Sequence, residues 1–97
     1  MNTNDFLEKE SEELAKELDA VYADARAIFI ERHKRYGAKN ISRAREVGVV
    51  VRMGDKLSRL ETRYLENGTV IDPENDWLDL CNYSLIGLLL QRGKWPK

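Results

Sequence analysis

The sequence contains few of the residues that give many small proteins covalent or metal-bound stability. Cys81 is the only cysteine and His33 is the only histidine. A lone cysteine excludes an internal disulfide and a zinc site built from several cysteines. We therefore expect a fold that depends on packing, with Cys81 as a small core residue and His33 at the surface.

Long apolar runs are also missing. Even residues 85–90, with Gly87 counted, fall far short of the roughly 20 apolar residues that cross a membrane. Residues 1–13 lack the basic start and apolar stretch of a secretory signal. The 42% hydrophobic and 34% charged fractions are typical of a globular protein, and 97 residues are enough for one core. We expect one cytoplasmic domain over residues 1–97, with no membrane partner.

Charge is distributed unevenly along the chain, although the net charge is only −1. Residues 1–31 hold nine acids and three bases, whereas residues 32–63 hold ten bases and three acids. Such a basic segment suits either a phosphate-bearing partner or a solvated helix surface. A nucleotide fits it more easily than a long polyanion, so no nucleic acid partner is expected.

The spacing of apolar residues predicts an all-α fold with three helices, at about residues 4–36, 41–65 and 73–92. The segment "GAKN" separates the first two helices. Asp72 as a cap, with Pro73 at the first helical position, starts the third, and Gly93 is a typical stop. Only the brief "TVI" alternates as a strand does, which favours the all-α class.

The apolar faces of the second and third helices are the predicted core. In the second helix this face is formed by Val49, Val50, Met53, Leu57, Leu60 and Tyr64. In the third helix it is formed by Trp77, Leu78, Cys81, Leu85, Leu88 and Leu89. The opposite side of the third helix carries Asp76, Asp79, Asn82 and Tyr83.

The first helix is longer than a compact protein of this size requires. At about 1.5 Å per residue, some 30 residues span roughly 45 Å. We therefore expect a helical bundle that is completed by oligomerisation, as a homodimer or a dimer of dimers. The first helix and a small-residue side around Gly54 and Ser58 are the expected contacts.

Two sets of charged residues could carry chemistry. Asp76 and Asp79 lie one turn apart, so both carboxylates can reach one hard cation such as Mg²⁺. The same acids also suit the positive end of a helix dipole. The second set is a stripe on the second helix, formed by Arg52, Asp55, Lys56 and Arg59. Its cations suit polyphosphate oxygens, although a solvated ion-pair face explains the same pattern.

Three segments carry a resemblance to a known family. The order "RYG", "VVVRMGDKLSRLE" and "NDWLDLCNYSLIGLLL" resembles the nucleotide-modification-associated domain proteins of phages and bacteria. These proteins are similar to the MazG-like all-α nucleotide pyrophosphohydrolases. The resemblance covers about residues 28–90, and its most specific parts are R-x-x-D-K-x-x-R-L and D-L-x-N-Y.

The resemblance implies a site and a reaction. In MazG-like enzymes, acids on two adjacent helices hold Mg²⁺ against a nucleoside triphosphate, which is cleaved between its α and β phosphates. The implied metal ligands are Asp76 and Asp79, with Asp55, alone or together with Glu31 or Asp24, in place of the acids of the other helix. Asp55 and Asp79 are then the catalytic acids. From the stripe and the polar side of the third helix, the substrate contacts expected for a nucleotide are Arg52, Lys56, Arg59, Asn82, Tyr83 and Tyr36. The chain departs from the family because "EELAKE" does not reproduce the E-E-x-x-E motif.

Three functional hypotheses follow. The first is a Mg²⁺-dependent nucleotide-binding protein of phage nucleotide metabolism that hydrolyses a triphosphate to a monophosphate and pyrophosphate. The second is a non-catalytic protein that binds or sequesters a nucleotide, which the missing motif favours. The third is a helical interaction module with solvated charges. The sequence contains no P-loop, dinucleotide glycine pattern or nucleophile motif, so we expect no protein nucleophile.

Overall fold

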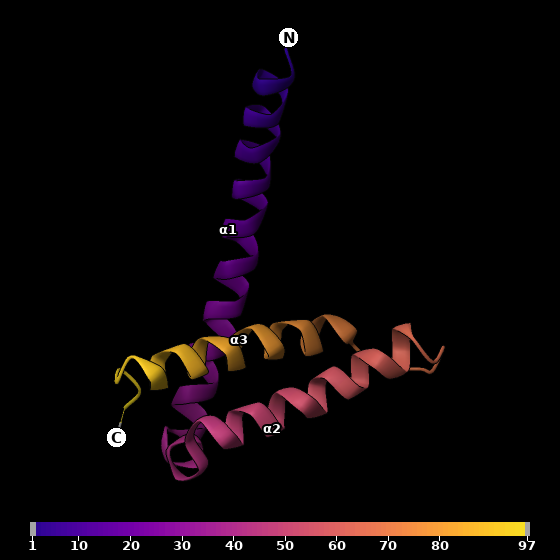
Figure 1. Ribbon diagram of the computed structural model, residues 1–97. Coiled ribbons are helices and arrows are strands. Elements are labelled where there is room, and N and C mark those ends of the chain that lie inside the picture. The colour runs from indigo at the N-terminus through magenta and orange to yellow at the C-terminus, as the bar shows by residue number, and fades with distance from the viewer. Residues whose placement is uncertain (1, 97) are drawn as a thin grey trace.

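The computed structural model describes residues 2–96, which form three helices and no strand (Figure 1). Helix α1 covers Thr3–Tyr36, α2 covers Lys39–Tyr64 and α3 covers Pro73–Gln91. The all-α class is confirmed, and each helix end lies within two residues of its predicted position. Across the described residues, no helix combines the length and apolarity needed to cross a membrane.

Local residues explain where α1 and α3 begin and where α1 ends. The Asn2 side chain accepts a hydrogen bond from the Asp5 backbone N–H at 2.9 Å and caps α1. Gly37 ends this helix with a φ of 71°, a conformation that glycine adopts without steric cost. Asp72 caps α3 and Pro73 follows it, as the sequence predicts.

Helix α2 begins at Lys39 without a side-chain cap, slightly before its predicted start. It is interrupted at Arg45, whose φ is 53°, so residues 39–44 form a separate first turn. The Ser42 hydroxyl donates a hydrogen bond to the Pro96 carbonyl at 3.3 Å. The first turn of α2 therefore holds the C-terminal tail in place.

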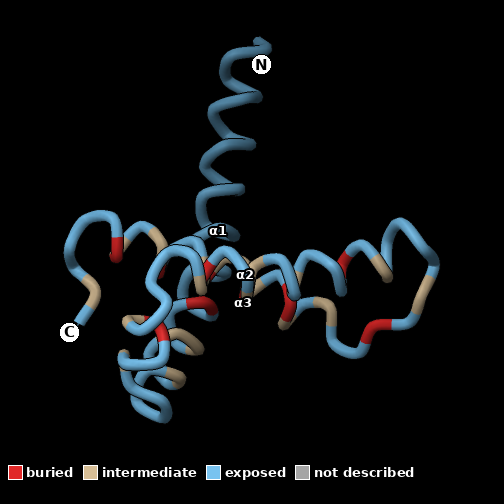
Figure 2. Tube along the Cα trace, turned by 60° about the horizontal axis from the view of Figure 1, so that its bottom comes forward, coloured by how far each residue is buried: buried red, intermediate tan, exposed pale blue. Residues whose placement is uncertain are grey.

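Helices α2 and α3 lie side by side and antiparallel, and α1 crosses them near its C-terminal end (Figure 1). The N-terminal half of α1 projects away from this pair, and the molecule measures 54 × 37 × 21 Å. In Figure 2 this half is exposed along its whole length. The helices consequently converge at one end of α1 only.

The core is small and lies where the three helices converge. Its buried members are Ile41, Val49, Ile86 and Leu90. The half-buried residues that pack against it are Phe29, Met53, Tyr83 and Trp95. On α2, Val49, Met53 and Leu60 confirm part of the predicted face, whereas the exposed positions of Val50, Leu57 and Tyr64 contradict the rest. Only a narrow side of α2 meets α3, which explains the difference.

The predicted core face of α3 is largely wrong for the single chain, because only Leu78, Cys81 and Leu89 of its six residues are even half-buried. Trp77 is 55% exposed, Leu85 and Leu88 are also exposed, and Cys81 is half-buried. Helix α3 instead turns the side with Asp76, Asp79 and Asn82 toward the other helices, and these three residues are buried. This orientation is stabilised because cations of α1 and α2 meet the two carboxylates and because Ile86 and Leu90, on the same side, are buried in the core.

Candidate functional site

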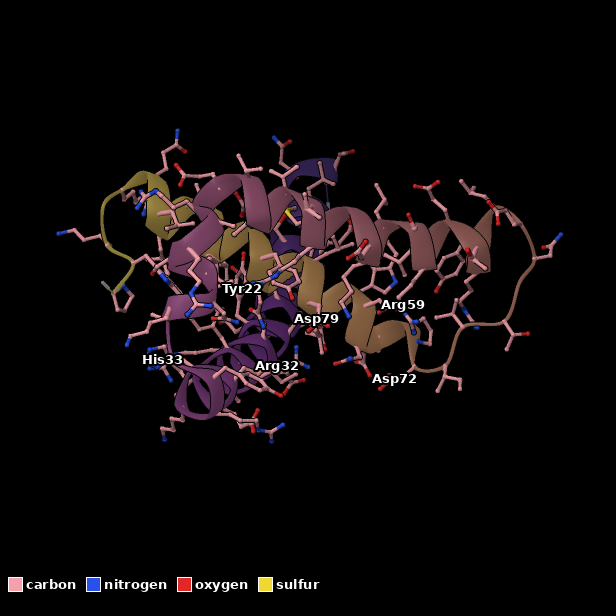
Figure 3. All side chains as sticks on the ribbon, turned by 90° about the horizontal axis from the view of Figure 1, so that it is seen from below. Tyr22, Arg32, His33, Arg59, Asp72 and Asp79 are labelled. Carbon is pink, nitrogen blue, oxygen red and sulfur yellow. The ribbon has the colours of Figure 1, made fainter. Side chains whose placement is uncertain are left out.

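Two carboxylates of α3 lie at the centre of the helix junction. Asp76 is 1% exposed and Asp79 is 3% exposed. Burial of a carboxylate is costly unless cations and hydrogen bonds compensate it. The compensating groups come from the two other helices, and Figure 3 shows Arg32 beside Asp79 and Arg59 further along α2.

Asp76 is held mainly by Arg59. The Nε–H of Arg59 is shared between both carboxylate oxygens of Asp76, at 2.9 and 3.0 Å. A second nitrogen of Arg59 donates to the Ile71 carbonyl at 3.4 Å. Arg59 thus connects α2 both to the first turn of α3 and to the loop before it.

Asp79 is held by one cation from each neighbouring helix. Arg32 on α1 donates to its Oδ1 at 2.6 Å, and Nζ of Lys56 on α2 lies 3.0 Å from its Oδ2. The same Nζ atom lies 3.8 Å from Asp76 Oδ1. Together these five side chains form an ion-pair cluster that joins all three helices: Arg32, Lys56, Arg59, Asp76 and Asp79.

The ion-pair cluster contains two of the three predicted Mg²⁺ ligands, Asp76 and Asp79. All four carboxylate oxygens of Asp76 and Asp79 already face a protein cation, so Mg²⁺ would have to displace at least one of them. Asp55, the third predicted ligand, is exposed on α2. Residues 2–96 contain no group of three or more acidic, histidine or cysteine side chains placed to hold a metal ion. The paired oxygens do not fit Mg²⁺ ligation as they stand, and the metal site stays a prediction.

A cavity of about 380 Å³ lies beside the cluster and shares Arg32 and Asp79 with it. This volume falls in the range of small-molecule sites, about 300–1,000 Å³. Five predicted site residues line the cavity: Tyr36, Arg52, Asp79, Asn82 and Tyr83. Four others lie outside its lining: Asp55, Lys56, Arg59 and Asp76. Apart from the exposed Asp55, the predicted site is thus divided between a cavity and a structural ion-pair cluster, and Asp79 belongs to both.

Aromatic rings form one wall of the cavity, and Trp95 connects them. Its ring makes edge-on contacts with Phe29 and His33, with ring centroids 6.1 and 6.3 Å apart. The indole N–H donates to the Ala38 carbonyl at 3.3 Å. These contacts fix the tail against the end of α1, and His33 is exposed at this wall, as expected for a surface histidine.

Three arginines also line the cavity, and they differ in how they are held. Arg32 is paired with Asp79, and Arg35 is paired with Glu31. Hydrogen bonding with Tyr36, and next the charge of Glu31, raises the pKa of the Arg35 guanidinium. Arg52 makes no ion pair within residues 2–96, so it is the arginine that is available to an anionic ligand.

Asn82 presents a buried acceptor at the same place. Its Nδ2 donates to the Ala25 carbonyl at 3.0 Å, whereas its Oδ1 is buried without a hydrogen-bond partner among the described residues. The reverse amide orientation would set two oxygens against each other, so the Ala25 contact fixes the side chain. Unpartnered buried polar atoms are uncommon and often occur at functional positions.

Several cavity residues were missed in the sequence: Phe29, Arg32, His33, Arg35 and Trp95. Four of them belong to "FIERHKR" at the end of the first helix, where Phe29 is followed by the run Arg32 to Arg35, which contains His33. That mixture could have indicated an anion site with aromatic walls. The part played by Trp95 depends on the tail folding back, which has no local sequence signal.

Comparisons of the chain with protein-family models, with curated proteins and with solved structures found no match.

Proposed function

We propose that this chain binds a nucleotide in the cavity between the end of α1, α2, α3 and the C-terminal tail. The observation that carries the proposal is that arginines and aromatic rings line the same cavity. Guanidinium groups bind phosphate oxygens through paired N–H donors, and aromatic rings stack on bases. A nucleotide is the common small ligand that needs both kinds of contact.

Arg52 makes the principal phosphate contact in this proposal. It is half-buried, it lines the cavity, and it is unpaired within the described part of the chain. Arg32 and Arg35 assist it from positions that Asp79 and Glu31 already fix. Side chains ordered before binding lose less conformational entropy when the ligand arrives. Tyr36, Tyr83 and Trp95 then offer surfaces for the base.

The motif resemblance supports the same class of ligand. The segment R-x-x-D-K-x-x-R-L contributes Arg52 to the cavity, and D-L-x-N-Y contributes Asp79, Asn82 and Tyr83. The paired carboxylates and the missing E-E-x-x-E motif favour binding without hydrolysis. Mg²⁺-dependent pyrophosphate release stays a prediction with its own test.

Calorimetric titration in the presence of a chelator tests the proposal. The ligands are the common nucleoside triphosphates and monophosphates, the matching nucleosides, and pyrophosphate. We expect nucleotides to bind more tightly than either nucleosides or pyrophosphate, because only nucleotides contact both the arginines and the rings. Repeating the incubation with Mg²⁺ and separating the products by chromatography distinguishes hydrolysis from binding.

Substitution of Arg52 provides the decisive comparison. Arg52→Gln removes a charged donor worth about 1.5–3 kcal/mol, so nucleotide affinity should fall about tenfold or more. Arg43→Gln removes an exposed charge from the first turn of the same helix and should leave the affinity unchanged. Equal binding by the two variants, or no binding of any nucleotide at millimolar concentration, would refute a nucleotide site in this cavity.

A further inference from the structure

We infer that a second copy of this chain covers the projecting half of α1, and that it does so with the outer face of its own α3. Residues 3–24 are exposed at every position, so this half of α1 has no tertiary packing within the chain. It is exposed throughout its length in Figure 2. Isolated helices are marginal in water, and most helices in proteins are stabilised by packing of an apolar face. The projecting half therefore needs a cover.

The uncovered stripe of α1 continues an interface that the chain already makes. Leu7, Leu14, Leu18 and Val21 recur at helical spacing on one face, and all four are exposed. One turn further along the same face is Ala25, which is buried and whose carbonyl accepts the hydrogen bond from Asn82 of α3. The same face of α1 therefore packs against the chain's own α3 at Ala25, and it continues past α3 as the uncovered stripe.

The outer face of α3 has the properties of the missing cover. Leu85 and Leu88 are exposed and Cys81 is half-buried, all on the side of α3 opposite its buried residues. Trp77 is exposed at the edge of this face, and its ring centroid lies 6.3 Å from that of Tyr64 on α2. Residues 80–91 contain no charged residue. At about 1.5 Å per residue, the 19-residue α3 is about 28 Å long, and residues 3–24 span about 33 Å. The two uncovered faces are similar in length and both are apolar.

The distribution of charge favours pairing of α1 with the partner's α3 over pairing of the two α1 helices. Residues 3–24 hold eight acids and two bases, so pairing the two α1 helices would bring like charges together. Apart from Glu74 in its first turn, the outer face of α3 is uncharged and adds little such repulsion. A two-fold arrangement lets each α1 cover the partner's α3, which removes both apolar faces of both chains from water. A second copy is therefore the occupant that the chain itself provides.

Sedimentation of charge-introducing variants tests this interface. We expect the wild-type chain to sediment as a dimer and both Leu18→Asp and Leu88→Asp to sediment as monomers, with helix content retained outside residues 3–24. Ala23→Asp lies on the opposite side of α1 and serves as the matched control, which should remain dimeric. A monomeric wild-type chain at about 100 μM would overturn the inference. The inference would also be overturned if Val51→Asp, on the outer side of α2, were the only variant that dissociated the dimer, because the interface would then lie on α2.

A cross-linking experiment identifies the contact without disturbing the fold. Leu14 lies eleven residues before Ala25, about 16 Å along α1, so an introduced thiol there is beyond the reach of Cys81 in the same chain. Mild oxidation of Leu14→Cys should give a dimer linked between the introduced thiol and Cys81, as peptide mapping would show. Lys16→Cys, on the other side of α1, should not cross-link. A link that persists when Cys81→Ser is added would mean that α1 pairs with α1, contrary to the inference.

Discussion

The Nε–H of Arg59 is shared between the two carboxylate oxygens of Asp76, at 2.9 and 3.0 Å, and Asp76 is almost completely buried. Trp77, the next residue, is mostly exposed. Lys56 extends the pairing to Asp79 one turn later. Cation–carboxylate contacts between α2 and α3, together with burial of Ile86 and Leu90 on the same side, therefore determine which side of α3 faces inward in the single chain.

Arg59→Ala tests this relationship. Removing the guanidinium leaves Asp76 with only the longer contact to Lys56, and an unsatisfied buried acceptor costs about 1–3 kcal/mol. We expect the free energy of unfolding in urea to fall by about that amount, measured at one protein concentration because assembly also contributes. Arg43→Ala, at an exposed position of the same helix, should change it little. If the two variants unfold alike, the pairing contributes no measurable stability.

The helices could be predicted from the sequence because their ends are determined locally. Asp72 with Pro73 starts α3, and Gly37 ends α1, whatever lies around them. The inward side of α3 could not be predicted, because periodicity separates two faces without saying which one meets a neighbour. Its apolar side was the natural choice, but the cations that meet Asp76 and Asp79 come from positions 17 to 47 residues away.

The candidate site was predicted in part for a similar reason. Arg52 and Tyr83 were singled out by their motifs, and both line the cavity. Lys56 and Arg59 belong to the same stripe as Arg52, yet they are paired with the carboxylates of α3. Helical spacing predicts that the three cations lie on one side of α2. Which of them pairs with a carboxylate and which faces the cavity depends on the position of α3, and the sequence does not give that position.

Asp79→Asn distinguishes a Mg²⁺ site from an ion pair. The substitution nearly preserves shape while removing the charge that Arg32 and Lys56 share. Because both cations remain partly solvated, we expect a loss of about 1–3 kcal/mol in unfolding free energy, equal with Mg²⁺ and with chelator. If Asp79 held Mg²⁺, the wild-type chain alone would gain stability from the metal. A Mg²⁺-dependent difference between the melting curves would restore the metal hypothesis.

Trp95 should contribute separately to the tail contact and to ligand binding. Trp95→Phe keeps an aromatic ring beside Phe29 but loses the hydrogen bond to Ala38, which costs about 0.5–1.5 kcal/mol of stability. Trp95→Ala also removes the ring from the cavity wall. We expect nucleotide affinity to fall clearly in Trp95→Ala and much less in Trp95→Phe, as measured by calorimetry. Equal affinities in these two variants would show that the ring does not contact the ligand.

Asn82→Asp should make the stability of the chain depend on pH. Asn82→Asp replaces the amide that donates to the Ala25 carbonyl with a carboxyl group. When ionised, this group faces the carbonyl oxygen in a buried position, one turn from the Asp79 carboxylate. Burial, the Ala25 carbonyl oxygen and the nearby Asp79 carboxylate all favour its neutral form. Its pKa in the folded state should therefore rise above the ordinary aspartate value of about 3.9. The protonated group can donate to Ala25 as the amide does.

The sign of the pH effect follows from linkage. The stabilising contribution of a group with a raised folded-state pKa is fully present below its unfolded pKa, and it is lost as pH rises through the folded pKa. Asn82→Asp should therefore be only mildly destabilised near pH 4 and increasingly destabilised toward neutral pH. The side chain in Asn82→Leu does not titrate. Subtracting the unfolding free energy of Asn82→Leu from that of Asn82→Asp at each pH therefore cancels the titration of all other groups and leaves that of the introduced carboxyl group. A difference between the two variants that stays constant from pH 4 to 8 would mean that the side chain at position 82 is hydrated and does not face Ala25.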